Sequence, residues 1–376
     1  MRVGIIIYGL DRPTVGISRY TLELVRALRK CELCQDLWLL HGGGLGPLRD
    51  AAGGREVSLP GAGRLPLLMT WGQIALWKRA KELKIDVIHD PTGTSPLALA
   101  GLRAATVTTI HDVFPWSMPG YSSFLDMLIY RQWLPRRWAG TDAVITVSDQ
   151  SRRDMEKFLL RETGVINVIP NGTSPKFRPL EQESVAAIVR DKLRIAGPYV
   201  LYVGALTQRK NVIRIIRAFD IVRHKVVGLK LVLAGPRSWK KSPVESAIAE
   251  LGLADHIHLT GPLPDEELPA LYNGAALFAF PSLYEGFGLP VLEAMACGTP
   301  VVTSNTSSLP EVAGDAALLV DPYDIDQIAD AMWRILSQPE LAAALRQKGL
   351  ARAARFTWER TARETLAVYE RVLANK

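Results

Sequence analysis

Two glutamates, Glu285 and Glu293, stand eight positions apart in an apolar stretch, FPSLYEGFGLPVLEAMACG, that spans residues 280–298. A carboxylate accepts two hydrogen bonds at once, which suits the neighbouring hydroxyls of a sugar. Two such groups on either side of a glycine turn predict a ligand with a sugar at each end, with Glu293 on a ribose and Glu285 on a second, transferred sugar. The alternative is that Glu293 only caps its own helix.

The turn between the glutamates has the composition of an anion site. Gly286 and Gly288 can adopt positive φ and expose backbone N–H groups, and Pro290, which follows Leu289, suits the first position of a helix. Exposed N–H groups beside a helix N-terminus bind phosphate. Together with Phe287, these residues predict the cradle of a diphosphate, and the ligand is then a nucleoside-diphosphate sugar.

Two adjacent cations, Arg209 and Lys210, follow the apolar run 199–203 and precede a helix that we expect to begin near Asn211. Cations beside a helix N-terminus form a phosphate-binding arrangement, so we expect both on the diphosphate. The alternative is a pair of solvated surface charges.

Histidines end or follow two apolar runs of the first half: His89 ends the run 86–89 and His111 follows the run 106–110. Side chains at the carboxyl ends of parallel strands face the ligand, so we expect His111 to be a site residue, although a lone histidine is more often structural. An aspartate follows each histidine, but the sequence does not fix the distance between the two pairs, and we predict no metal site.

Gly16 lies in the loop before Ser18, which we expect to cap the helix 18–28. A glycine at this point lets the backbone approach an anion, and a plain strand-to-helix turn is the alternative. The segment lacks the G-x-G-x-x-G pattern of dinucleotide-binding turns.

The candidate site residues can meet only if the strands before them end on the same side of a sheet. Short apolar runs, typical of strands buried on both faces, alternate with helical patterns along the whole chain. This alternation predicts doubly wound α/β sheets. The pattern restarts after a stretch rich in proline and glycine, so we expect two similar domains joined near residues 172–197 and facing each other across a cleft. The expected strands are 3–7, 37–40, 86–89, 106–110, 143–147, 166–169, 199–203, 230–234, 256–259, 276–280, 300–303 and 317–320, and the clearest helices are 212–222, 265–271, 290–297 and 324–336.

The composition of the 376-residue chain, with 48% apolar and 22% charged residues, is that of a globular enzyme. No apolar run is long enough to span a membrane, and the sequence predicts a cytoplasmic protein. Its three cysteines include one isolated C-x-x-C pair, Cys31 and Cys34, which lacks half the ligands of a zinc site. The net charge of +7 comes entirely from residues 1–180, which hold 23 Lys and Arg against 16 Asp and Glu, so an anionic partner or a merely solvated basic face is expected there.

Taken in order, six segments resemble the retaining glycosyltransferases of the GT-B fold, group 1, glycosyltransferase family 4. They are GISRYTLELVRAL, TIHDVFPW, DAVITVSDQSRRDM, VIPNGTSPKFRP, YVLYVGALTQRKN and the long segment GPLPDEELPALYNGAALFAFPSLYEGFGLPVLEAMACGTPVV. The last segment contains the family's E-x₇-E motif, and the resemblance covers nearly the whole chain.

The resemblance implies roles for the candidate residues. It implies Glu285 on the hydroxyls of the donor sugar, Glu293 on the ribose, Arg209 and Lys210 on the diphosphate, and His111 near the donor sugar.

The resemblance also implies base contacts from the backbone near Leu263. It implies an acceptor-binding domain over 1–180, a nucleotide-sugar-binding domain over 196–358, and a final helix, 359–376, that packs back on the first domain. Many members have an arginine where this chain has Ala205, which shifts phosphate neutralisation to the two cations.

The expected reaction is hexose transfer, with retention, from GDP-mannose or UDP-glucose to a saccharide or lipid-linked saccharide acceptor. We expect no metal, no cofactor and no nucleic-acid partner; the Asp324-to-Asp326 pattern is expected to start a helix, with Asp324 as its cap. A sugar-nucleotide epimerase or phosphorylase of the same fold, and a non-catalytic nucleotide-sugar-binding protein, are the alternatives.

A basic amphipathic segment, residues 64–84, could bring the protein to an anionic membrane surface. Its apolar residues are followed directly by a basic stretch; the apolar set is Leu68, Trp71, Ile74, Ala75 and Leu76, and the stretch after it is Trp77, Lys78, Arg79, Lys81 and Lys84. The alternative is a core helix with a solvated basic end.

Overall fold

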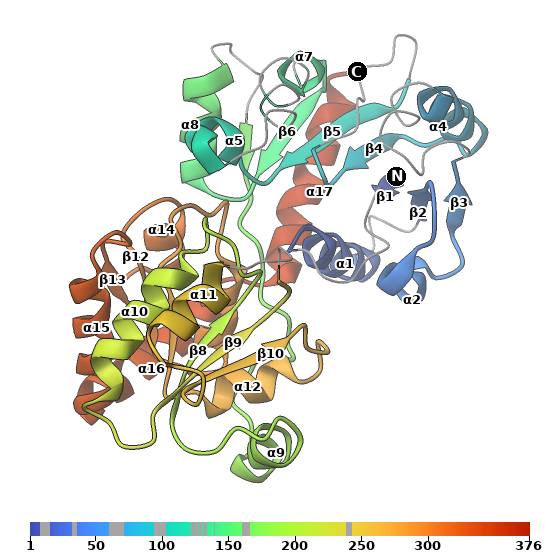
Figure 1. Cartoon of the computed structure of the whole chain (residues 1–376). Helices are drawn as coiled ribbons and strands as arrows, with labels where there is room; N and C mark the ends of the chain where they lie inside the picture. Colours follow the sequence, from blue (N-terminus) through green and yellow to red (C-terminus); the bar gives the residue numbers. More distant parts are fainter. Residues whose placement is uncertain are drawn as a thin grey trace. The chain divides into compact units, whose positions relative to one another are not determined.

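The computed structural model describes residues 1–7, 16–31, 36–59, 71–93, 103–121, 127, 130, 134–138, 140–159, 166–237 and 243–376. The chain divides into two compact units, one made of residues 1–172 with 357–376 and the other of residues 173–356 (Figure 1). The chain thus leaves the first unit after Gly172 and returns to it at Thr357.

The first unit is built on a parallel sheet of seven strands in the order β3-β2-β1-β4-β5-β6-β7. Successive strands are added toward one side of the sheet from β1 to β3 and toward the other side from β4 onward. The strand order therefore reverses between β1 and β4, as in a doubly wound fold. The six strands predicted for this half are present, and the edge strand β3 is the addition. The strands are β1 Arg2–Ile7, β2 Asp36–His41, β3 Glu56–Ser58, β4 Val87–Asp90, β5 Ala105–Ile110, β6 Ala143–Thr146 and β7 Ile166–Val168.

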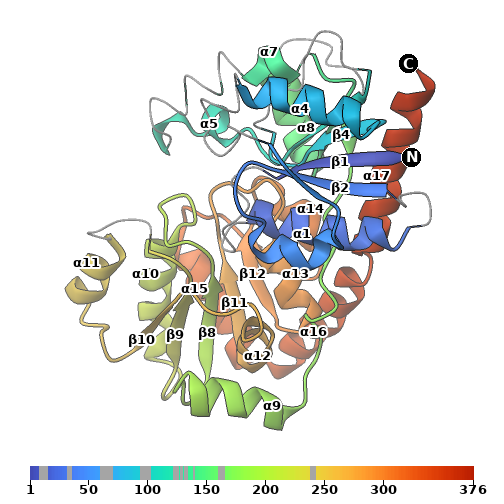
Figure 2. The same cartoon turned by 90° about the vertical axis from the view of Figure 1, so that its right-hand side faces the viewer.

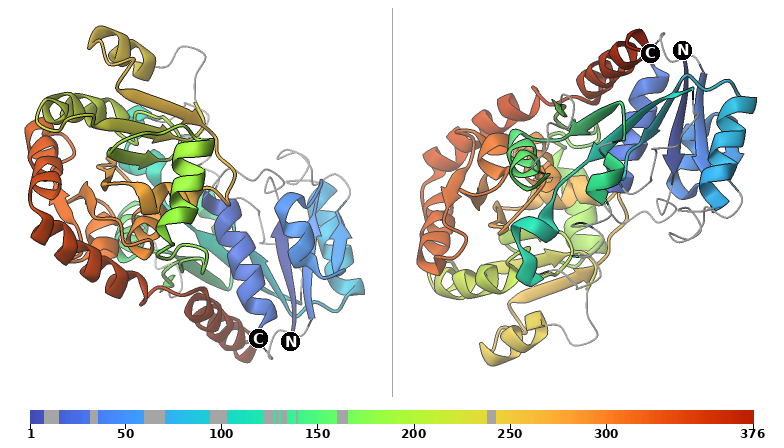
Figure 3. Two further views of the ribbon diagram at one scale, coloured as in Figure 1. Left: turned by 90° about the horizontal axis from the view of Figure 1, so that it is seen from below. Right: turned by 90° about the horizontal axis from the view of Figure 1, so that it is seen from above.

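Helix α1 and the C-terminal helix α17 pack against each other in the first unit, and α17 also contacts β5 and β6. Both termini lie at the same end of this unit (Figure 3). The prediction that Ser18 caps α1 is wrong, because the helix already begins at Gly16 and Ser18 is buried within its first turn. The helices are α1 Gly16–Arg29, α2 Arg49–Ala52, α4 Trp71–Glu82, α5 Phe114–Ser117, α7 Leu134–Trp138, α8 Asp149–Leu159 and α17 Trp358–Ala374, with short 3₁₀ turns at Gly46–Leu48 and Pro119–Tyr121.

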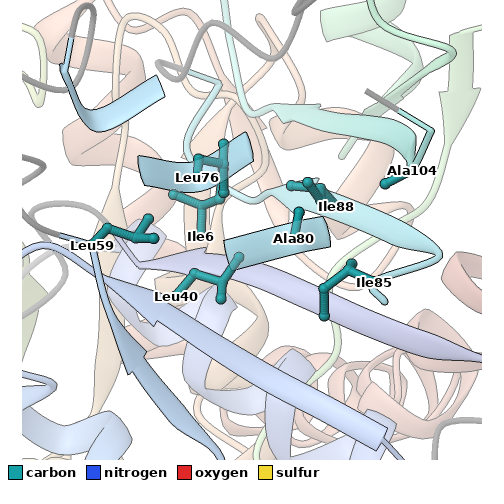
Figure 4. Close-up of a cluster of buried hydrophobic side chains, with 8 residues drawn as sticks. All are labelled: Ile6, Leu40, Leu59, Leu76, Ala80, Ile85, Ile88 and Ala104. Carbon is teal, nitrogen blue, oxygen red and sulfur yellow. The ribbon is translucent and has the colours of Figure 1, made fainter. Parts of the chain in front are cut away.

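One face of the first sheet is closed by α4 (Figure 4). Leu76 and Ala80 of this helix pack on side chains from three neighbouring strands, among them Ile6, Leu40 and Ile88. Because side chains alternate along a strand, the residue after Ile88, His89, points to the opposite face. That is the face on which α17 lies.

The second unit repeats the design with six parallel strands in the order β10-β9-β8-β11-β12-β13. Figure 2 shows β10, β9 and β8 side by side. All six predicted strands of this half are present. The strand order reverses between β8 and β11. The prediction of doubly wound α/β sheets is therefore confirmed for both halves. The strands are β8 Tyr199–Val203, β9 Lys230–Ala234, β10 Ile257–Gly261, β11 Leu277–Phe280, β12 Val301–Ser304 and β13 Leu318–Val320.

Helices cover both faces of the second sheet. Helix α10 packs against α11 and α15, whereas α13 packs against α12, α14 and α16. The expected helix 265–271 begins three residues late, because residues 264–267 first form a turn closed by the Glu267 N–H on the Pro264 carbonyl. The helices are α9 Gln182–Ala186, continued by a π-helical turn Ala187–Lys192, α10 Val212–Arg223, α11 Pro243–Glu250, α12 Leu268–Gly274, α13 Leu289–Ala296, α14 Leu309–Ala313, α15 Ile325–Ser337 and α16 Pro339–Ala353.

Several predicted features lie at or beyond the limits of the described residues. Cys34 and residues 64–70, including Leu68, lie outside them, and so does the side chain of Trp71.

Asp324 caps α15 as predicted, because its carboxylate accepts from the Gln327 N–H at 2.9 Å. Across the part of the chain that the structure describes, no helix is long and apolar enough to cross a membrane.

Candidate active site

The carboxyl ends of three adjacent strands, β8, β11 and β12, meet at the reversal point of the second sheet. The loop after β8 carries Arg209 and Lys210, the loop after β11 carries Glu285, and the loop after β12 carries Ser307. This is the position at which open α/β sheets bind their ligands. The strand order therefore brings together residues that are 75 positions apart in the sequence.

The carboxylate of Glu285 is the centre of a charged cluster. Lys210 Nζ lies 2.6 Å from Oε1, and Arg209 Nη1 lies 3.4 Å from Oε2. Ser282 donates to Oε1 at 2.6 Å. Burial would raise the pKa of Glu285, but the two cations and these hydrogen bonds outweigh it and hold the pKa below its usual value. Glu285 is therefore an ionised, buried hydrogen-bond acceptor.

The two cations are themselves anchored. Arg209 Nη1 donates to the carbonyl of Tyr284 at 2.7 Å. The ammonium of Lys210 also lies over the ring of Phe280, 4.9 Å from its centroid, a cation–π contact that favours the charged form. Asn211, which follows them, donates from Nδ2 to the carbonyls of Pro281 and Pro322 and ties the loop to the end of β11.

Serine hydroxyls fix the backbone of the Glu285 loop. Ser307 accepts from the Glu285 N–H at 2.9 Å, and the single Ser308 hydroxyl proton is shared between the carbonyls of Glu285 and Phe287, at 2.9 and 2.7 Å. Sequence reasoning missed these serines and Ser282. The run SNTSSLPE after the strand 300–303 was the available signal, because hydroxyl groups at a strand's carboxyl end can bond the neighbouring loop.

The glycine turn leads into α13 as the sequence predicts, but only one of its glycines needs positive φ. Gly288 has φ 116° and is the N-cap of the helix, and a Cβ on it would come within 2.8 Å of Leu309. Gly286 is not among the residues with positive φ. Helix α13 begins at Leu289, so Pro290 is its second residue and not its first as predicted. The helix N-terminus and its N–H groups therefore lie directly after the Glu285 loop.

Glu293, the second carboxylate of the motif, lies inside α13 and is almost fully buried. Its Oε2 accepts from the hydroxyl of Tyr272 on α12 at 3.0 Å. Leu263, the expected neighbour of the base, lies in the loop after β10, at the same edge of the sheet and three strands from β11.

Gly16 and His111 belong to the first unit, and the other candidates belong to the second. Gly16 is the exposed first residue of α1, and a Cβ there would meet no atom of the described residues within 4 Å. His111 lies directly after β5. Its Nε2 is 2.8 Å from the carbonyl of Pro91, so Nε2 must carry a proton. Burial lowers the pKa of His111, which leaves the neutral ring with an unprotonated Nδ1 that can accept a hydrogen bond.

His89, the other histidine at a strand end, has a different environment. Its two ring nitrogens bond the hydroxyls of Tyr369 and Thr109, so both are occupied by protein groups. Within the described ranges, no three His, Cys, Asp or Glu side chains gather as the ligands of a metal ion.

Comparison with known proteins gives the same relationship for both halves of the chain. Residues 15–177 match the family described as Glycosyltransferase Family 4, and residues 188–352 match Glycosyl transferases group 1. The O-antigen chain mannosyltransferase B of Escherichia coli is 30% identical over 371 residues, which cover 95% of this chain and 96% of that protein.

Solved structures share the fold over the full length. Sucrose-phosphate synthase from Thermosynechococcus elongatus superposes with a TM-score of 0.82 at 23% identity, covering 100% of both chains. HepE of Anabaena, solved in complex with UDP-glucose, has a TM-score of 0.79 at 19% identity and covers 98% of this chain and 100% of its own. With two doubly wound units and a relative that matches almost end to end, this chain belongs to the group 1 glycosyl transferases of Glycosyltransferase Family 4 and has the GT-B fold.

Proposed function

We propose that this glycosyltransferase moves a hexose from a nucleoside-diphosphate sugar to a hydroxyl of a saccharide or lipid-linked saccharide, with retention at the anomeric carbon and without a metal ion or other cofactor. The observation that carries the proposal is the cluster at the reversal point of the second sheet, in which the buried Glu285 pairs with the half-buried Lys210 and Arg209. It combines a sugar-binding carboxylate with phosphate-binding cations.

The cations supply the electrostatic part of the chemistry. When the bond between the anomeric carbon and the phosphate oxygen breaks, negative charge develops on the leaving diphosphate. Lys210, Arg209 and the N-terminus of α13 stabilise that charge, and they are held in place beforehand by Glu285, Phe280 and the Tyr284 carbonyl. Preorganised charges of this kind lower a barrier because they need not rearrange during the reaction.

Glu285 acts as a hydrogen-bond acceptor for the hydroxyls of the donor sugar. Its lowered pKa keeps it ionised near neutral pH, so it cannot serve as a general acid, and two cations and a serine already reduce its basicity. Glu293 binds the ribose, Leu263 lies at the base through its backbone, and Gly286, Phe287, Gly288 and Leu289 form the diphosphate turn.

For the first unit, the proposal gives the unprotonated Nδ1 of His111 the role of accepting a hydrogen bond from a hydroxyl of the donor sugar, and it gives Gly16, at the N-terminus of α1, a role in binding the donor. The proposal assigns no protein nucleophile. Retention then requires that the acceptor attack on the face that the leaving diphosphate occupies, with a diphosphate oxygen taking the acceptor proton.

GDP-mannose is the donor that we favour, because the full-length relative from Escherichia coli is named as a mannosyltransferase. UDP-glucose is the second candidate, since the HepE structure contains it. The test is a panel of nucleoside-diphosphate sugars with a polysaccharide acceptor, scored by release of nucleoside diphosphate and by NMR of the new anomeric centre. An inverted product would overturn the proposal of retention.

The same panel separates the other expectations. Turnover that survives excess EDTA supports metal independence, whereas loss with EDTA and rescue by Mg²⁺ or Mn²⁺ contradicts it. An epimerase would change the sugar without releasing nucleoside diphosphate, and a binding protein would show affinity for the nucleotide but no release.

We also propose that the protein binds peripherally to the inner face of the membrane, where a lipid-linked acceptor would be present. Ile74 and Trp77 are exposed on α4, by 60% and 38%, and Lys81 lies over the Trp77 ring at 5.3 Å. Exposed apolar side chains beside lysines on one helix suit an anionic lipid surface. Leu76, which the sequence analysis placed in the segment's apolar set, is instead fully buried in the core.

A further inference from the structure

A chain of hydrogen bonds runs through the buried face of the first unit. The hydroxyl of Tyr369 on α17 lies 2.6 Å from His89 Nδ1, and His89 Nε2 lies 2.8 Å from the Thr109 hydroxyl. The Thr109 hydroxyl lies 3.2 Å from that of Tyr20 on α1. None of the four side chains is more than 1% exposed, so water does not complete the chain.

The chemistry of His89 makes this chain interdependent. Burial lowers its pKa to about 3, so the ring is neutral and has one donor and one acceptor nitrogen. Thr109 has one hydroxyl proton to share between His89 and Tyr20. Whichever direction the protons take, removal of the Thr109 hydroxyl leaves polar groups on both sides without their bond, and buried polar groups are costly to leave unpaired.

The end of the chain touches the site residue of this unit. The rings of Tyr20 and His111 meet edge to face, with centroids 4.7 Å apart and an interplanar angle of 85°. His111 is also held by its bond from Nε2 to the Pro91 carbonyl. A ring fixed by one hydrogen bond and one edge contact has a defined plane, and that plane sets the direction of Nδ1.

Helix α17 supplies the origin of the chain and a second support. Tyr369 lies 280 residues from His89 in the sequence, and Trp358, at the start of the same helix, packs on the Tyr20 ring with centroids 5.8 Å apart. Tyr20 is therefore held by α17 twice, once through Thr109 and His89 and once directly.

We propose that Tyr20, held by Thr109, His89 and Tyr369, is a positioning residue for His111. The hydrogen-bond chain lets the C-terminal helix set the orientation of a ring in the active site. The inference rests on the proposed function only in that His111 contacts the donor sugar.

The sequence offers a matched pair of variants for the test. Thr108 and Thr109 are consecutive buried residues of β5, and the Thr108 hydroxyl has no partner among the described residues, whereas the Thr109 hydroxyl has two. Thr109→Val and Thr108→Val remove the same hydroxyl from the same strand and keep the β-branched shape. Thr109→Ser restores the hydroxyl.

We expect Thr109→Val to lower kcat about 10-fold with the donor KM within about 2-fold, because a misplaced site group affects turnover more than binding. Thr109→Ser should return kcat to within about 3-fold of the parent, and Thr108→Val should leave it unchanged, as expected for a hydroxyl outside the chain. Tyr369→Phe keeps the ring and removes the hydroxyl at the far end of the hydrogen-bond chain. It should also lower kcat, as Thr109→Val does.

Thermal unfolding and nucleoside-diphosphate affinity of each variant show whether it is folded at the assay temperature. Equal kcat values for the folded Thr109→Val and Thr108→Val proteins would overturn the inference, and so would a kcat loss that serine does not restore. His111→Gln distinguishes the two levels of the argument. If that variant turns over normally, the proposed role of His111 fails; if it is impaired while Thr109→Val is not, only the positioning by Tyr20 fails.

Discussion

Replacing Glu285 by glutamine tests whether the charged cluster governs both stability and donor binding. The change keeps the shape of the side chain and removes its charge. In the parent, that carboxylate is the shared partner of Lys210 at 2.6 Å and of Arg209 at 3.4 Å, with side-chain exposures of only 9%, 14% and 25% for Glu285, Lys210 and Arg209. Glu285→Gln therefore leaves two poorly hydrated cations close together with no anion between them.

The magnitude follows from the burial of the pair. Removing one partner of a buried ion pair costs about 3–5 kcal/mol, and the partial exposure of Arg209 lets water screen it, so we expect about 2–3 kcal/mol of lost unfolding free energy. For a unit of the size of residues 173–356, each kcal/mol lowers Tm by about 2–4 °C. Glu285→Gln should then lower Tm by about 4–12 °C.

A nucleoside diphosphate should reverse much of this loss. Its phosphates supply the negative charge that the two cations lack in the variant, whereas in the parent they must compete with the carboxylate. We therefore expect added GDP or UDP to raise Tm more in Glu285→Gln than in the parent, by the usual linkage of ligand affinity to stability. Sugar transfer should still be largely lost, because the acceptor of the sugar hydroxyls has changed.

Differential scanning fluorimetry with and without nucleotide, with isothermal titration at one temperature, measures both effects. Glu245→Gln is the matched control, because Glu245 pairs with Arg237 at the surface of the same unit, where an ion pair contributes about 0–1 kcal/mol. A Glu285→Gln protein with the parent's Tm and the parent's nucleotide-induced shift would refute the argument that this cluster is poised for a diphosphate.

Three further predictions concern other parts of the chain. Glu293→Gln should weaken nucleoside-diphosphate binding by about 1–3 kcal/mol, as for a lost charged hydrogen bond; titration calorimetry checks it, and unchanged affinity contradicts the ribose assignment. Burial lowers the pKa of His89 from 6.5 to about 3. As the pH falls below 6.5, the unfolded chain therefore gains a proton on this histidine and the folded chain does not. The unfolding free energy should decline between pH 6.5 and pH 3 by up to about 1.4 kcal/mol per pH unit. Urea unfolding at pH 7, 6 and 5 should show that the unfolding free energy of His89→Gln depends less on pH than that of the parent. The same pH dependence in both proteins would contradict a neutral buried ring. Replacing Ile74 and Trp77 together by serine should reduce co-sedimentation with anionic vesicles at low salt without changing turnover of a soluble acceptor; binding that ignores lipid charge would argue for a soluble acceptor instead.

The architecture was predictable because it depends on local pattern. All twelve expected strands are present, each with ends within two residues of the prediction. The strand that was missed, β3, covers only Glu56–Ser58 and lies at the sheet edge with two of its three residues exposed, so it lacks the apolar run that marks a buried strand. Helix ends were less predictable, as Ser18 in α1 illustrates, because neighbouring residues differ little in their preference for the first turn.

The site was predictable as a set of loops but not as a set of contacts. The sequence placed Glu285, Lys210 and Arg209 at carboxyl ends of strands, and the motif resemblance assigned them to one ligand. That Glu285 pairs with both cations depends on β8 and β11 being neighbours across the reversal point, which strand patterns do not reveal. The bond between Tyr272 and Glu293 likewise needs the packing of α12 on α13.

The two His-Asp pairs show why position within a strand matters more than the dipeptide. His89 is still inside β4, directly after Ile88, and because Ile88 faces α4, the pleat turns His89 toward α17 and Tyr369. His111 lies one residue beyond β5, where the chain has left the sheet. Its Nε2 bonds the Pro91 carbonyl, and among the described residues its Nδ1 has no hydrogen-bond partner, whereas both nitrogens of His89 are bonded. A shift of one residue in the end of either strand would exchange a ring bonded within the core for a ring that can meet a ligand. The same two letters therefore give a structural histidine in one place and a candidate ligand-binding histidine in the other.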